Sequence, residues 1–160
     1  MKSQKGRNQK QMDLEEQYYK IFRYCCLKVK RTAIAEDLTQ ETFLRYFSQS
    51  TYIELGKQTA YLYTIARNLC NDYFSKQIYW EELKDDVPYT EGDTDMKLTV
   101  RQAVEMLPKD LQEIVLLRFV NEVPVKDIAA FMELSRFAVN RRIKDALKRL
   151  KEVLREEDFS

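Results

Sequence analysis

The sequence predicts an all-α protein of two small helical domains, and three observations lead to that prediction. The chain has 160 residues with only three glycines and three prolines, which favours helices over a turn-rich β fold. Apolar side chains recur at spacings of three and four residues over most of its length, as on one face of an amphipathic helix. Between two such stretches, residues 78–95 are acidic, contain a proline and a glycine, and have no sustained period. We therefore expect two helical bundles joined by an acidic linker.

The first domain is expected over residues 12–77, after a polar tail at 1–11 that we expect to be disordered. Helices are predicted at 14–29, 33–47 and 59–77, and three helices with short connections make a small bundle. The apolar face of the first helix is Leu14, Tyr18, Ile21, Phe22, Cys25 and Val29. The inward face of the second is Leu38, Thr42, Phe43, Tyr46 and Phe47, and that of the third is Leu62, Ile65, Ala66, Leu69 and Tyr73.

The second domain is expected over residues 96–155 and contains four predicted helices. The first ends at Pro108, which suits the first turn of the next helix, through residue 120. Pro124 likewise starts a short helix at 125–132, and a longer one follows at 136–154. The predicted inward faces are Met96, Val100, Ala103, Val104 and Leu107; then Val125, Ile128 and Ala129; then Val139, Ile143, Ala146, Leu147, Leu150 and Leu154.

Composition argues against several classes of function. The chain has no histidine, which excludes Ser-His and Cys-His nucleophiles and His-containing metal sites. Cys25, Cys26 and Cys70 have no metal-ligand spacing, so we expect buried reduced thiols, no metal, no cofactor and no catalytic residue. An acid-based or metal enzyme would have to use Asp85-Asp86 or residues 91–95, which lie in the linker without a rigid frame. No apolar run reaches the roughly 18–20 residues of a membrane span, so we expect a cytoplasmic protein without membrane insertion.

Charge is unevenly distributed, although the net charge is only +1. Residues 1–31 have nine Lys and Arg against three Asp and Glu, and residues 134–151 have seven against one. Residues 78–100 have two basic against seven acidic side chains. Two basic regions separated by an acidic one suggest two modules that face a polyanion, although either could be a solvated lysine-rich surface.

The C-terminal pattern predicts a helix-turn-helix: a short helix, a turn at residues 133–135 and a longer basic helix. Ser135 is a natural N-cap for the second helix, although the turn lacks the glycine often found there. At about 100° per residue, one outward sector contains Phe137, Arg141, Lys144 and Lys148, while Arg142 and Arg149 lie on its flank. Such a helix suits the major groove of DNA; the alternative is a solvated basic face on an ordinary bundle.

The N-terminal domain has two candidate surfaces. Glu36, Asp37, Gln40 and Glu41 line the solvent side of the second helix and suit a protein partner, unless they merely satisfy the helix macrodipole. Tyr52, Tyr61 and Tyr63, with nearby Lys57, Arg67 and Lys76, could stack on unpaired bases, although core or rim packing is the better explanation for Tyr61 and Tyr73. Asn68 could read a base edge or be an ordinary surface residue.

The order of these motifs is more informative than any one of them. Residues 35–44 (AEDLTQETFL), residues 61–69 (YLYTIARNL) with Asp72-Tyr73, then Leu107-Pro108 and the helix-turn-helix resemble bacterial RNA polymerase sigma factors of the extracytoplasmic-function (ECF) type. The resemblance covers about residues 14–152. It implies a dissociable specificity subunit, not an enzyme, that recruits core RNA polymerase and nucleates promoter melting. The alternative is a stand-alone helix-turn-helix regulator, which would bind duplex operators tightly without polymerase and have a dimerisation surface.

The resemblance also implies roles for particular residues. Asp37, Gln40 and Glu41 would contact the clamp helices of the largest polymerase subunit, and the C-terminal domain would meet the flap. Tyr52, Arg67, Asn68 and Lys76 would bind the melted promoter −10 element, and the linker would thread the polymerase channels. The residues implied for the duplex −35 element are Phe137, Asn140, Arg141, Arg142, Lys144 and Lys148. An anti-sigma factor is a further implied candidate partner.

Two residues of the predicted recognition helix depart from the family. Asn140 and Asp145 stand where members often have basic or small residues. Asp145 would repel phosphate, so we expect it to accept from a cytosine amino group, to pair with Arg141 or Arg149, or to point away.

Overall fold

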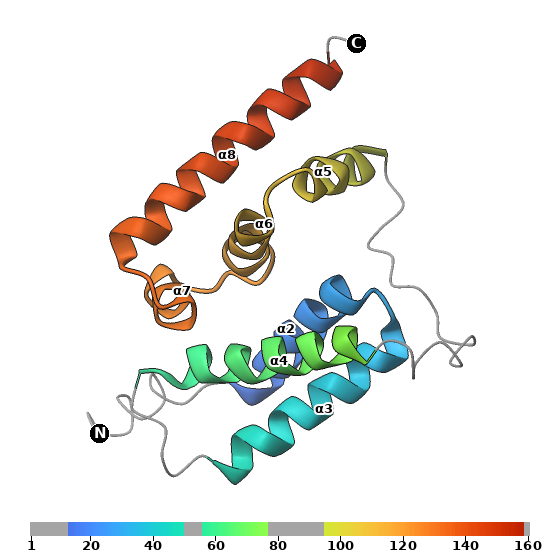
Figure 1. Ribbon diagram of the computed structural model, residues 1–160, viewed down its shortest axis with the longest axis vertical. Coiled ribbons are helices and arrows are strands. Elements are labelled where there is room, and N and C mark those ends of the chain that lie inside the picture. Colours follow the sequence, from blue (N-terminus) through green and yellow to red (C-terminus); the bar gives the residue numbers. More distant parts are fainter. Residues whose placement is uncertain (1–12, 50–55, 77–94, 159–160) are drawn as a thin grey trace. The chain divides into compact units, whose positions relative to one another are not determined.

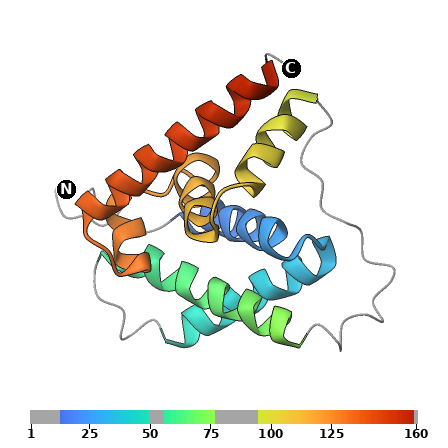
Figure 2. The ribbon, with the colours of Figure 1, turned by 45° about the horizontal axis from the view of Figure 1, so that its top comes forward.

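The computed structural model describes residues 13–49, 56–76 and 95–158, and the elements in these ranges are helices (Figures 1 and 2). The chain divides into two compact units, Met1–Tyr89 and Thr90–Ser160. The predicted all-α fold with two helical domains is therefore confirmed. The predicted tail, residues 50–55 of the loop with Tyr52 and residues 78–94 of the predicted linker lie outside the described residues. The same holds for Asp85-Asp86 and for residues 91–94, which were considered for an enzyme.

The first unit is a bundle of three helices, α2 (Leu14–Val29), α3 (Thr32–Ser48) and α4 (Gln58–Ser75), each in contact with the other two. Asp13 caps α2, because its Oδ1 accepts from the Glu16 N–H at 3.2 Å. The core contains large side chains with no exposed surface, and Tyr24 meets Tyr63 edge to face with ring centroids 5.5 Å apart. The five residues predicted for the inward face of α4 are all buried.

Two buried threonines of this core donate hydrogen bonds to backbone carbonyls. Thr39 and Thr42 are fully buried on α3, and their hydroxyls donate to the carbonyls of Ala35 and Leu38, four residues earlier, at 2.6 and 2.7 Å. The three cysteines are buried thiols outside any disulfide, as predicted. A hydrogen bond with Cys70 lowers the pKa of the Cys25 thiol, against the effect of burial.

The second unit is built around α8 (Arg136–Asp158). Three shorter helices pack along one side of it: α5 (Asp95–Glu105), α6 (Lys109–Val115) and α7 (Val125–Met132) (Figures 1 and 2). One cluster of the core consists of Leu107, Leu111, Val115 and Ala146, with Val104 and Leu150 against it. The Gln112 side chain donates to the carbonyls of Glu105 and Leu107, at 3.1 and 2.7 Å, and so satisfies carbonyls at the end of α5.

The helix predicted through residue 120 changes its winding after α6. Leu116–Val120 is a π-helical turn, in which the Asn121 N–H donates to the Leu116 carbonyl, five residues earlier, at 3.0 Å. Ile114 through Leu117 are four consecutive buried residues, which an α-helix would spread over about 300°. The π-helical turn begins at Leu116, within this buried run.

A few residues predicted to face inward are exposed. Phe47 is 52% exposed and Leu147 40%, and Leu14 and Val100 are exposed to a similar degree. Periodicity identifies the direction of an apolar face but not how far a neighbouring helix extends to cover it. Leu14 and Phe47 lie within a turn of an end of their helices.

The turn before α8 contains a non-glycine residue in the left-handed region: Glu133, with φ 56° and ψ 44°, ends α7. This conformation costs a residue with a Cβ roughly 1–2 kcal/mol, and glycine adopts it freely. We therefore expect Glu133→Gly to raise the free energy of unfolding of the second unit by about 1 kcal/mol, measured by urea denaturation.

The matched control is Ala130→Gly, three residues earlier on the exposed side of the same helix. There glycine lies inside a regular helix and should lower the free energy of unfolding by about 1 kcal/mol. A loss of stability in both variants would show that the backbone of Glu133 is not strained.

Candidate nucleic-acid interface

The helix-turn-helix is held by its cap and by buried contacts between its two helices. Ser135 is the N-cap of α8, as predicted: its Oγ accepts from the Ala138 N–H and its carbonyl from the Val139 N–H, both at 3.0 Å. Ile128 on α7 and Val139 on α8 have no exposed surface. The first turns of α8 are therefore fixed against α7, with one side of the helix turned to solvent.

That open side contains the predicted outward sector. Phe137, Arg141, Lys144 and Lys148 are all exposed, and so is Asn140. Phe137 is 73% exposed, and the guanidinium carbon of Arg141 lies 5.3 Å from the centre of its ring. The start of α8 thus presents an aromatic ring and a cation together, followed by two lysines one and two turns further along.

The two arginines on the flank are paired with carboxylates. Arg149 Nε lies 3.1 Å from Asp145 Oδ1, so of the alternatives for Asp145 the structure selects pairing with Arg149. Arg142 lies 3.0 Å from Asp110 Oδ2 on α6. Asp110 was not identified from the sequence, because a partner 32 residues away has no spacing signal. These partly exposed pairs add little stability, but they reduce the charge available to phosphate.

On α4, the candidate base-binding residues lie on the outer side. Asn68 and Lys76 are exposed and Arg67 is half-buried. Tyr61 packs against Tyr46 with ring centroids 6.2 Å apart, and Tyr73 is buried, so the packing explanation for Tyr61 and Tyr73 is confirmed. Burial also raises the pKa of Tyr46. Tyr52 lies outside the described residues, and the binding roles of the others remain predictions.

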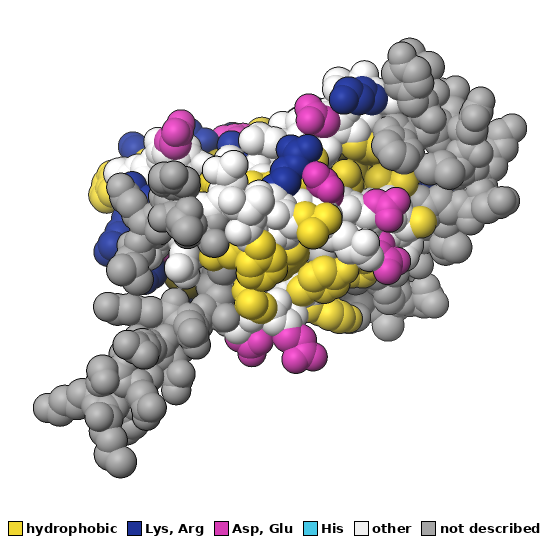
Figure 3. Space-filling view, turned by 90° about the horizontal axis from the view of Figure 1, so that it is seen from below, with side chains coloured by type: hydrophobic (Ala, Val, Ile, Leu, Met, Phe, Trp, Pro, Cys, Tyr) yellow, Lys and Arg dark blue, Asp and Glu magenta, His cyan; other side chains and the backbone are white. Residues whose placement is uncertain are grey.

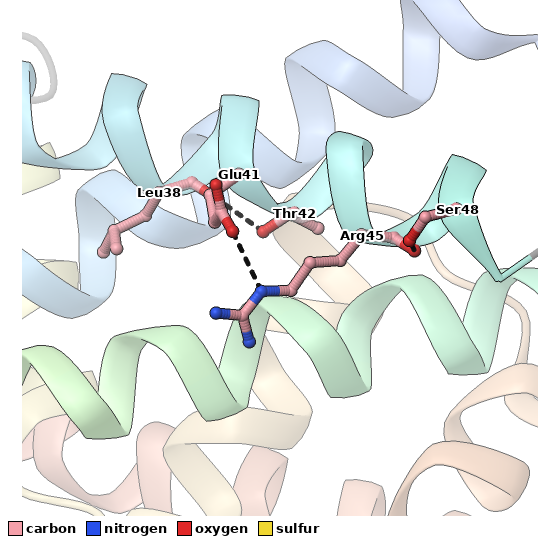
Figure 4. Close-up of polar contacts among 5 residues, drawn as sticks. All are labelled: Leu38, Glu41, Thr42, Arg45 and Ser48. Atoms are coloured by element: carbon pink, nitrogen blue, oxygen red, sulfur yellow. Dashed lines mark hydrogen bonds and ion pairs between the residues drawn. The ribbon is translucent and has the colours of Figure 1, made fainter.

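The outer face of α3 has an acidic part. Glu36, Asp37 and Gln40 are exposed, and Glu41 pairs with Arg45 through a contact of 3.0 Å (Figure 4). Because α3 begins at Thr32, its first turn has no acidic residue, and the effect of the helix dipole falls off beyond that turn. The macrodipole explanation of this stripe therefore has little support.

The same face continues with apolar side chains that the sequence reasoning missed. Leu44, seven residues or about two turns from Asp37, is 66% exposed, and Phe47 is 52% exposed near Gln40 on the helix surface. Seen from below, hydrophobic side chains gather on the molecular surface with acidic side chains beside them (Figure 3). The seven-residue spacing was the available signal, since it places Leu44 on the face of Asp37. Exposed apolar groups beside charged ones are typical of protein-binding surfaces.

In the part of the chain that the structure describes, no group of three or more Cys, Asp or Glu side chains could hold a metal ion. No described helix is both long and apolar enough to cross a bilayer.

Comparison with known proteins gives two family matches in order along the chain. Residues 15–78 match Sigma-70 region 2, and residues 97–150 match Sigma-70, region 4. The ECF RNA polymerase sigma factor BldN of Streptomyces coelicolor is 34% identical over 125 residues, which are 70% of this chain and 47% of BldN. The ECF RNA polymerase sigma factor SigW of Bacillus subtilis is 24% identical over 157 residues, 86% of this chain and 84% of SigW. The chain thus spans about half the length of BldN and most of SigW.

Two solved structures share the fold. The sigma factor RpoE of Bartonella quintana, in complex with the anti-sigma factor NepR, has a TM-score of 0.65 and 23% identity, covering 89% of this chain and 94% of RpoE. CnrH, in complex with the cytosolic domain of CnrY, has a TM-score of 0.63 and 17% identity, covering 86% and 82%.

The Asp145–Arg149 pair yields a prediction about affinity for duplex DNA. Asp145→Asn removes the carboxylate and frees Arg149 for phosphate. The plot of log affinity against log salt should become steeper by about one unit, with tighter binding at low salt. Fluorescence anisotropy of labelled duplex DNA titrated with the full chain measures both.

Glu152→Gln is the control, because it makes the same charge change on exposed α8 two turns further along. An equal gain in affinity for duplex DNA in both variants would mean that the change in net charge, rather than the release of Arg149, causes the tighter binding.

Proposed function

The chain belongs to the ECF group of the sigma-70 family, and from this premise we propose that it is an alternative sigma factor for transcription initiation. In this role it binds core RNA polymerase, recognises the −35 and −10 elements of promoters and nucleates their melting. The observation that carries the proposal is the presence, in one chain and in order, of a region 2 unit and a region 4 unit.

The second unit is proposed to read the −35 element as duplex DNA. The proposed contacts are Phe137, Asn140, Arg141, Arg142, Lys144 and Lys148. Four of them share the open sector of α8, where long donors can reach base edges and phosphates. The ion pair of Arg142 with Asp110 makes it the weakest of the six, since a phosphate must compete with a carboxylate already in place.

The first unit is proposed to hold the melted −10 element with Arg67 and Asn68 on α4, with Lys76 directly after α4 and with Tyr52 in the sequence before it. Extruding a base from the stack costs a few kcal/mol, so stacking and amide contacts must offset that cost. The exposure of Asn68 supports this proposal, because its amide is accessible to a base edge.

The outer face of α3 is proposed to bind the clamp helices of the largest polymerase subunit through Asp37, Gln40 and Glu41. The carboxylates of Asp37 and Glu41 would repel a duplex or single strand of nucleic acid, whereas they would attract a basic protein surface. The exposed Leu44 and Phe47 add apolar area of the kind that protein interfaces bury. The second unit would meet the polymerase flap.

The domain limits proposed are residues 12–77 for region 2, 78–95 for the linker through the polymerase channels, and 96–155 for region 4. A non-enzymatic role follows from the family, whose members direct initiation by the polymerase. RpoE is seen with the anti-sigma factor NepR, and CnrH with the cytosolic domain of CnrY. An anti-sigma factor is therefore also proposed as a partner of this chain.

Co-purification with bacterial core RNA polymerase, followed by run-off transcription from a genomic fragment library, tests the proposal. Stable binding and promoter-dependent transcripts are expected, together with weak binding of the free protein to duplex DNA. If the protein does not bind core polymerase but binds duplex DNA tightly, it is instead a stand-alone helix-turn-helix regulator.

Asp37→Arg should weaken binding to core polymerase at least tenfold, because a cation replaces a carboxylate at the proposed contact. Asp72→Arg on α4 makes the same change at another exposed position of the first unit and should retain binding. The affinity of each variant for core polymerase, measured without DNA, distinguishes the two substitutions. Unchanged helicity by circular dichroism shows that the variants are folded. Equal binding by both variants would remove α3 from the polymerase contact.

Asn68→Ala should lower promoter opening about tenfold, because one amide contact to an unpaired base is lost. Asn71→Ala removes an equally exposed amide almost one turn further along α4 and should have little effect. Permanganate footprinting of the melted region measures opening, and binding of the holoenzyme to a single-stranded −10 oligonucleotide reports the contact itself. Wild-type opening by Asn68→Ala would overturn this assignment.

A further inference from the structure

The first turns of α8 contain a pair of side chains for which the fold gives no packing role. Phe137 is 73% exposed, the largest exposed fraction among the large hydrophobic residues that the structure describes. An exposed aromatic ring on a helix whose opposite side supplies the core is available for a ligand. Arg141 lies one turn further along the same sector, with its guanidinium over the ring.

Arg141 differs from Arg142 and Arg149, the two arginines on the flank of α8, in its partners. Arg142 and Arg149 each pair with a carboxylate, whereas no carboxylate among the described residues pairs with Arg141. The Phe137 ring limits the orientations of the guanidinium without neutralising its charge. Its planar, forked donors stay available for a bidentate acceptor, which Lys144 and Lys148 cannot match because an ammonium acts as a point charge.

The chemistry of the two side chains fits one pattern of base edges. In the major groove, arginine donates to O6 and N7 of guanine, and an apolar side chain contacts the C5-methyl group of thymine. Residues four apart on a helix are separated by about 6 Å along its axis, and successive bases by about 3.4 Å. The two contacts therefore fall one or two base pairs apart.

We propose that Phe137 and Arg141 act as one reading unit for a thymine and a guanine within two base pairs of each other in the −35 duplex. Phe137 contacts the thymine methyl group, and Arg141, held against the ring, donates to the guanine. This inference rests on the proposed function and names the base pattern that its −35 site selects.

The test uses reconstituted holoenzyme and a promoter fragment identified by its own transcription. Each −35 thymine is replaced in turn by uracil, which removes only the methyl group, and each guanine by 7-deazaguanine, which removes the N7 acceptor. For the wild-type protein, one uracil position should weaken binding about fourfold, the effect of one buried methyl group. One deazaguanine position within two base pairs of it should weaken binding by a similar or larger factor.

The variants assign each contact. Phe137→Ala should weaken binding to the unmodified promoter and lose the sensitivity to uracil, and Phe137→Leu should keep part of that sensitivity. Arg141→Ala should lose the sensitivity to deazaguanine. Because both residues are exposed, the variants should keep the helicity and the polymerase affinity of the wild type.

Full uracil sensitivity in Phe137→Ala would overturn the proposal, as would sensitive thymine and guanine positions further apart than two base pairs. A loss of polymerase binding in Phe137→Ala, with DNA recognition unchanged, would make the ring a protein contact and also overturn it. If wild-type holoenzyme does not form or does not bind promoters, the proposed function itself fails, which is a separate and recognisable result.

Discussion

Burial of one apolar face on each short helix is the constraint on which the rest of this structure depends. Helices of seven or eight residues, such as α6 (Lys109–Val115) and α7 (Val125–Met132), are too short to be stable alone in water. They persist because they pack against α8, whose inward side contains Val139 and Ala146 without exposed surface. The same packing decides which side chains of each helix remain exposed to solvent. The core of each unit therefore determines where its candidate binding residues lie.

The basic character of α8 is moderated by its acidic neighbours. Asp110 and Asp145 each pair with an arginine, so the helix offers less charge to phosphate than its sequence indicates. Phosphate contacts dominate the affinity of most DNA-binding proteins, and a helix with fewer of them depends more on base contacts. Few phosphate contacts and a larger share of base contacts suit the proposed subunit, which acts on promoters only when it is assembled with polymerase. Selectivity then depends mainly on the exposed side of α8, whose cations are not paired with any carboxylate of the described residues.

The candidate sites could be predicted to different extents. The outward sector of α8 followed from helical periodicity, because its four residues recur at spacings of three and four. The acidic stripe of α3 could be predicted equally well, and spacing could also have placed Leu44 beside it, but Phe47 was predicted to be buried and is exposed. Whether an apolar side chain at the end of a face is covered depends on where the neighbouring helix stops, which no local pattern encodes.

The sequence by itself determined the helices, their order, the Ser135 cap and the two family regions, because each depends on residues close together in the chain. Only the tertiary structure decided that Asp110 pairs with Arg142. The structure was also needed to show that Asp145 pairs with Arg149 rather than Arg141, and that Glu133 has a left-handed backbone conformation at the end of α7. It also placed the π-helical turn after α6. The Asp110–Arg142 pair depends on the distance between α6 and α8, which is set by the packing of side chains far apart in the sequence. The Asp145–Arg149 pair lies within α8, where Arg141 and Arg149 are both four residues from Asp145 and only the side-chain conformation distinguishes them.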